Sequence, residues 1–93
     1  MAKFKLGQEV MTKGVAEAIE KNEKFAKEVI VAFLRYKKCD WGDLCKDDKE
    51  MNDEAVKLNN DRIVAKYNTC EGGIFIITEY DRSVTTILFT SEY

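Results

Sequence analysis

The residues best suited to binding chemistry are seven carboxylates that lie between positions 40 and 54. Their order lacks the D-x-[DN]-x-[DN]-G spacing of a calcium loop, and Trp41 stands where a ligand or a small spacer would be expected. One interpretation is a solvated helix whose first carboxylates, Asp43 and Asp47, favour the positive end of the helix dipole. The alternative is an acidic surface that imitates nucleic-acid phosphate and occupies a basic groove on a partner protein. This acidic surface would consist of Asp47, Glu50, Asp53 and Glu54.

A second set of polar residues could form a structural network or a ligand site. Helical spacing places Asp48 and Asn52 between two apolar groups, on the side of the same segment that faces the core. Because a carboxylate on a core face is costly unless it is paired, we expect Arg82 to pair with Asp48, and the indole N–H of Trp41 is a second candidate. We expect this polar constellation to lock a helix to a sheet, with a ligand site or small enzyme as the alternative. Its members are Trp41, Asp48, Asn52, Glu79, Asp81, Arg82 and Thr86.

The hairpin part of the constellation is more polar than a turn requires. Glu79 and Asp81 could act as paired carboxylates, but glycosidase chemistry also needs a sugar cleft that a domain this small rarely encloses. We therefore expect them to stabilise the turn. Since Thr85 and Thr86 alternate faces, only one of them can join the network with Arg82.

The absence of histidine excludes Ser-His-Asp triads, Cys-His pairs and His-containing zinc sites. The cysteines Cys39, Cys45 and Cys70 show no C-x-x-C spacing, and no glycine-rich phosphate loop is present. We therefore expect no catalytic residue, no metal and no cofactor, with all three cysteines as free buried thiols.

Composition indicates a single domain over residues 1–93, with 45% hydrophobic residues and a net charge of −2. A pI near 5.2 argues against direct nucleic-acid binding. There is no apolar run of about 18 residues, so we expect no membrane partner. An odd number of cysteines and the lack of a secretory leader favour the cytoplasm.

Hydrophobic spacing predicts three helices before a β-rich end. Thr12 is suited to cap a short helix that ends near residue 20, and residues 23–38 form the clearest helix, with an apolar arc wide enough to be contacted from more than one side. Asp43 is suited to cap a third helix that buries Leu44, Met51, Ala55 and Leu58. Residues 3–11 suggest a short extended segment.

Alternation and β-branched composition predict strands at 61–68, 73–79 and 83–90. The fold class is α+β, with N-terminal helices packed on one face of a C-terminal three-stranded antiparallel meander. The second strand is apolar on both faces, so the face away from the helices is covered either by the N-terminal segment or by a second chain in a homodimer.

Several motifs resemble a small uncharacterised bacterial family whose members are often labelled plasmid-related proteins. The matching segments are Asp40-Trp41-Gly42-Asp43, the Asp48 and Asn52 that follow, the hairpin run from Ile76 to Leu88 and the closing Glu92-Tyr93. In the family, Trp replaces Phe75 and Pro tends to replace Lys13. The resemblance implies a mobile-element context, in which small genes often encode inhibitors of host defence systems. We therefore expect a non-catalytic protein-binding module, an inhibitor of a host defence nuclease that acts through the acidic surface.

Overall fold

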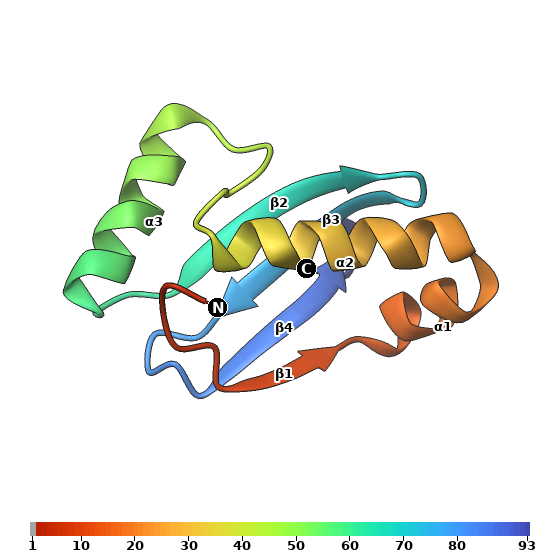
Figure 1. Cartoon of the computed structure of the whole chain (residues 1–93), viewed down its shortest axis with the longest axis horizontal. Coiled ribbons are helices and arrows are strands. Elements are labelled where there is room, and N and C mark those ends of the chain that lie inside the picture. Colours follow the sequence, from red (N-terminus) through yellow and green to blue (C-terminus); the bar gives the residue numbers. More distant parts are fainter. Residues whose placement is uncertain (1) are drawn as a thin grey trace.

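The computed structural model describes residues 2–93 and places three helices between the first strand and the last three. The order of elements is visible in Figure 1. Their bounds are β1 (Gln8–Met11), α1 (Lys13–Lys21), α2 (Glu23–Lys37), α3 (Lys46–Leu58), β2 (Ile63–Thr69), β3 (Gly72–Thr78), β4 (Val84–Phe89) and a 3-10 turn, η1 (Thr90–Glu92).

One sheet with the strand order β1-β4-β3-β2 forms the centre of the fold. The predicted α+β class is confirmed, and β2, β3 and β4 form the expected antiparallel meander. The prediction of a three-stranded sheet was wrong, because β1 adds a fourth strand parallel to β4. This strand lies within the extended segment expected near the N-terminus, but its partner is more than seventy residues away, beyond the reach of local pattern.

The predicted central helix, α2, buries Phe25, Val29, Ala32 and Tyr36 against the sheet. A side-chain cap marks the start of each of the first two helices. Thr12 Oγ1 accepts a hydrogen bond from the Val15 N–H in α1, and Asn22 Oδ1 accepts one from the Phe25 N–H in α2. The wide apolar arc of α2 is contacted from more than one side, as expected, because both α1 and the sheet pack against the helix, but part of the arc remains open to solvent. Its residues Ile30 and Leu34 are 61% and 50% exposed.

The third helix differs most from its prediction. It begins at Lys46 rather than after Asp43, and Cys45 occupies the cap position without a side-chain hydrogen bond. Asp43 instead donates its backbone N–H to Lys66 O of β2, so the residues before the helix are held by the sheet. Of the four residues expected to be buried, Ala55 is buried and Leu44 half-buried, whereas Met51 and Leu58 are exposed.

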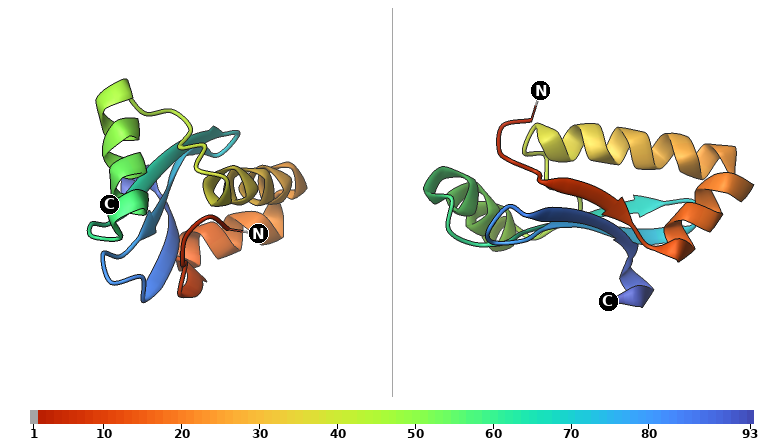
Figure 2. Two further views of the ribbon diagram at one scale, coloured as in Figure 1. Left: turned by 60° about the vertical axis from the view of Figure 1, so that its left-hand side comes forward. Right: turned by 90° about the horizontal axis from the view of Figure 1, so that it is seen from below.

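The two faces of the sheet are covered differently. α1, α2 and the N-terminal segment lie on one side, where Phe4 packs edge-on against Tyr36, and Figure 2 shows the C-terminal turn on the other side. There Tyr93 contacts Phe75 with a ring separation of 5.4 Å. The sequence offers two covers for this second face, the N-terminal segment or a second chain. The first of these is wrong, because the N-terminal segment lies on the other face with α1 and α2.

Candidate functional site

The acidic surface lies on α3, at one end of the molecule away from α1 (Figure 1). All four of its predicted residues are exposed, and Glu50 makes a long ion pair of 3.9 Å with Lys46 on the same helix. Residues 40–61 carry eight carboxylates and three lysines, a net charge of −5. The remaining residues carry twelve Lys/Arg and nine Asp/Glu, or +3. Negative charge is therefore concentrated on and around α3.

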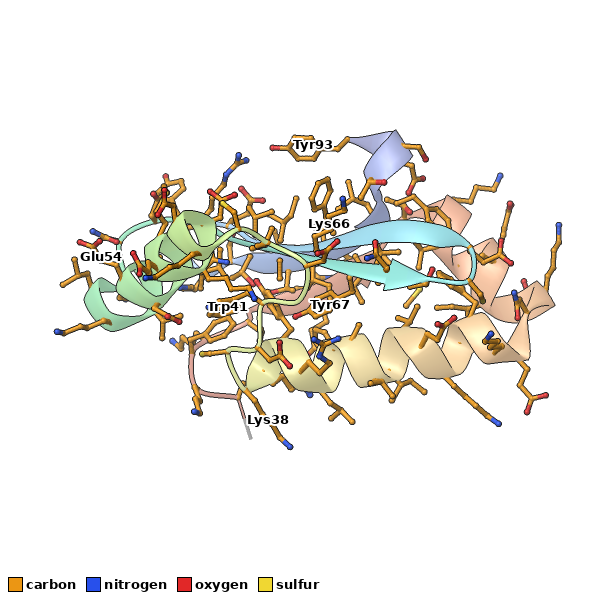
Figure 3. All side chains as sticks on the ribbon, turned by 90° about the horizontal axis from the view of Figure 1, so that it is seen from above. Lys38, Trp41, Glu54, Lys66, Tyr67 and Tyr93 are labelled. Atoms are coloured by element: carbon orange, nitrogen blue, oxygen red, sulfur yellow. The ribbon has the colours of Figure 1, made fainter. Side chains whose placement is uncertain are left out.

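Trp41 connects this helix to the hydrophobic core. Its ring is 3% exposed and packs edge-on against Tyr36 at 5.5 Å, and its Nε1 donates to Asp53 Oδ1 at 2.9 Å. Figure 3 shows Trp41 beside α3, with Glu54 further along the helix. The sequence offers Trp41 as a second candidate partner for Asp48. In the structure, the carboxylate that accepts from the Trp41 indole is that of Asp53 instead. One carboxylate of the acidic surface therefore also positions the helix.

Asn52 anchors the middle of α3 to the outer edge of β2. Its Nδ2 donates to Val64 O at 2.8 Å, and its Oδ1 accepts from Val64 N at 3.3 Å. The prediction that Asn52 points towards the core was correct, since the residue is buried. The amide takes the place that a neighbouring strand would occupy and satisfies both outward backbone groups of Val64.

The loop before α3 covers the next part of the same edge. Lys66 donates its N–H to Trp41 O, and its carbonyl accepts from Asp43 N at 2.7 Å. Gly42 lies between them with a φ of 74°, and a Cβ at this position would collide with the Lys66 carbonyl and the Tyr67 ring. Glycine is therefore required where the loop approaches β2.

Arg82 has a structural role with a different partner from the one predicted. It is 6% exposed, and its guanidinium donates to the carbonyl oxygens of Asp61 at 2.6 Å and Ala55 at 2.9 Å. It also reaches the carbonyls of Glu79 and Tyr80. Asp48, the expected ion-pair partner, is exposed on α3. The prediction of this pair was wrong because backbone carbonyls, which sequence reasoning cannot place, surround the buried cation.

A chain of hydroxyl groups crosses the helix-facing side of the sheet. Tyr36 and Thr78 are joined at 2.7 Å, Thr78 and Thr85 at 2.7 Å, and Thr85 Oγ1 donates to Leu6 O at 2.6 Å. Burial raises the pKa of Tyr36 well above its usual value. Thr86 of the predicted constellation lies on the opposite face, so Thr85 is the threonine that joins a buried network.

The hairpin carboxylates do not form a paired acid and base. Asp81 Oδ1 accepts from Ser83 N at 3.0 Å, and the hydrogen bonds from Ser83 lower the pKa of Asp81. The Glu79 carbonyl accepts from the Arg82 backbone N–H and from its guanidinium. Both residues hold the turn, in which Arg82 has a φ of 61°.

A cavity of about 350 Å³ between α3 and the second sheet face contains the remaining polar residues. Asp48 and Asn52 line it, together with Phe75, Arg62 and Tyr93, which sequence reasoning had not assigned to a site. The Arg62 guanidinium lies 6.0 Å from the centre of the Tyr93 ring. The predicted constellation is therefore divided: Asp48 and Asn52 share this cavity, whereas Glu79, Asp81, Arg82 and Thr86 do not line it.

The three cysteines are all free, and the pKa is raised at two of them. Cys45 and Cys70 are exposed and Cys39 half-buried, so the expectation of three buried thiols was wrong, although all three are free. Burial raises the pKa of Cys39, and a hydrogen bond with Glu28 raises that of Cys70, which keeps both as thiols at neutral pH. Within residues 2–93, no group of three or more metal-ligating side chains is arranged to hold an ion.

Comparisons with protein-family models, with curated proteins and with solved structures give no match. Along residues 2–93, no helix combines the length and the apolar character needed to cross a membrane.

Proposed function

We propose that this chain is a non-catalytic protein-binding module whose acidic surface, Asp47, Glu50, Asp53 and Glu54, occupies a basic groove on another protein. The main support is the combination of exposure and anchoring in α3. Its carboxylates face solvent, while Asn52, Trp41 and the Ala55 carbonyl attach the helix to the rest of the fold. Because the helix is anchored at these points, its outward carboxylates project from a backbone that is fixed relative to the sheet.

Anchoring favours binding because the acidic surface loses little conformational freedom when a partner docks. The charge distribution adds long-range attraction. With −5 on residues 40–61 and +3 elsewhere, a basic partner is steered to the α3 end of the molecule.

The partner that fits this chemistry is a nucleic-acid-processing protein with a basic groove. A host defence nuclease in the cytoplasm is our proposed example, on the strength of the resemblance to plasmid-related proteins. The acidic helix would compete with the phosphate backbone for the groove and so inhibit the enzyme.

The test is capture of binding proteins from the native host with three matched forms of the chain. The first is wild type, and the second carries Asp47→Lys, Glu50→Lys and Glu54→Lys but keeps Asp53, because Asp53 also holds Trp41. The third carries Glu17→Lys, Glu20→Lys and Glu23→Lys, an equal charge change on exposed residues of α1 and α2.

We expect wild type and the third form to capture the same stoichiometric basic protein, and the second form to lose it. Equal capture by all three forms would refute the proposal, as would the absence of any stoichiometric partner.

The second candidate function is a small-ligand site, favoured by the cavity that Asp48 and Asn52 share. Asp48→Asn should then abolish a ligand-induced rise in melting temperature, whereas Asp47→Asn, on the same turn of α3, should not. If neither variant changes the response to any ligand in a screen, this alternative is excluded.

A further inference from the structure

The two edges of the sheet are protected to different degrees. At β2, the outward backbone groups of Val64 and Lys66 are bonded to Asn52, Trp41 and Asp43. At β1, Gln8 N bonds to Ser83 O and Thr12 N to Ile87 O, so the alternation of a parallel ladder turns Glu9 and Met11 outward. Among the described residues, no hydrogen bond reaches the backbone N–H and C=O groups of these two residues. The β1 edge is open.

An apolar groove lies beside this open edge. It has a volume of about 420 Å³ between β1 and α2, with Thr85 and Ile87 of β4 among its lining residues. Three large side chains around it remain well exposed: Met11 at 44%, Ile30 at 61% and Leu34 at 50%. An unpaired strand beside exposed apolar side chains is the usual surface for strand addition.

We propose that a second copy of this chain pairs with β1 in antiparallel orientation and joins the two sheets into one of eight strands. The hydrogen-bonding pattern allows only registers that place outward residues opposite each other. Glu9 opposite Glu9 would set like charges face to face, which is unfavourable. Met11 opposite Met11 would leave Glu9 beyond the paired strand.

The remaining register places Glu9 of each copy opposite Met11 of the other. Both pairs are of the hydrogen-bonded type and exchange four bonds in all. Val10 meets Val10 on the two-fold axis, and the exposed apolar residues beside β1 gain cover.

This interface differs from the α3 surface and from the second sheet face, so it is independent of the proposed function. A wild-type mass of twice the 10.7 kDa chain mass in sedimentation equilibrium is the first expected result. The proposal would be overturned if the protein remained a monomer at all concentrations up to about 1 mM, which we take as the weakest dimer dissociation constant of interest.

Two matched pairs of variants test the interface and its register. Glu9→Pro removes an outward N–H and should weaken dimerisation about tenfold or more, whereas Glu9→Thr removes the same charge but keeps the N–H and should remain dimeric. If both variants are folded by circular dichroism and equally dimeric, β1 is not the interface.

The second pair does not depend on the stability of a proline variant. With Cys45 and Cys70 replaced by serine, Val10→Cys should form a disulfide across the two-fold axis, with oxidised glutathione accepting the two electrons and two protons. Gln8→Cys, on the same face of β1 but away from the axis, should not. Equal cross-linking of the two variants, or none at Val10→Cys, would overturn the proposed register.

Discussion

The side-chain amide of Asn52 holds both backbone groups of Val64, donating to the carbonyl at 2.8 Å and accepting from the N–H at 3.3 Å. Through this contact, α3 satisfies the outward hydrogen-bonding groups of Val64 at the β2 edge of the sheet. The contact also sets the position of α3, and therefore of the carboxylates that we propose bind a partner.

Replacement of Asn52 by aspartate should destabilise the fold by about 2 kcal/mol, because a carboxylate repels the Val64 carbonyl to which the amide now donates. Urea unfolding followed by circular dichroism measures the change. Asn60→Asp, at an exposed position after α3, is the control and should change the free energy of unfolding by less than about 0.5 kcal/mol. Similar values for the two variants would show that the Val64 contact contributes little.

Arg82→Ala should destabilise the protein by about 3 kcal/mol or more, since four carbonyl oxygens from three segments lose their donor. Arg82→Lys should recover only part of this loss, because one ammonium cannot reproduce the planar fork. Thermal unfolding compares the two with wild type. An Arg82→Ala variant with unchanged stability would contradict this structural role.

The buried tyrosines should make the protein sensitive to alkali. Burial raises the pKa of Tyr36 and Tyr67 above their ordinary value of 10.0. In the unfolded chain both phenols ionise near that value, so their contribution to stability is complete below pH 10 and decreases as the pH rises above it. Tyr36→Phe should reduce the slope of unfolding free energy against pH between about 10 and 12. An unchanged slope would contradict this origin of the pH dependence.

The carboxylates of the acidic surface should differ in their effect on stability. Asp53→Ala removes the acceptor of the Trp41 indole and should cost about 1 kcal/mol, with a change in Trp41 fluorescence. Glu54→Ala, the neighbouring exposed carboxylate, should change stability by less than about 0.5 kcal/mol. If the two substitutions have the same effect, the Trp41–Asp53 bond does not anchor α3.

Local sequence pattern predicted those elements whose signals are local. The cap at Thr12, the buried face of α2 and the three strands of the meander follow from spacing and residue type alone. The pairing of β1 with β4 depends on contacts more than seventy residues apart. The start of α3 was missed because Asp43 looks like a cap but is used by β2 instead.

In the polar constellation, too, only the positions that local helical pattern determines were predicted correctly. Asn52 was correctly placed towards the core, because its position in the helical pattern is enough to show it. Asp48 lies only one turn away, yet it is exposed, since α3 contacts the sheet along a narrower strip than its apolar residues suggest. The carbonyl partners of Arg82 belong to loop geometry that no side-chain pattern reveals.

The most direct test of the central claim is the salt dependence of affinity for the captured partner. If the acidic surface occupies a basic groove, the affinity should fall about tenfold or more between about 0.05 M and 0.5 M salt, because screening weakens attraction between exposed charges. The Asp47, Glu50 and Glu54 variant should bind weakly at both concentrations. An affinity that stays constant across this range would contradict the account.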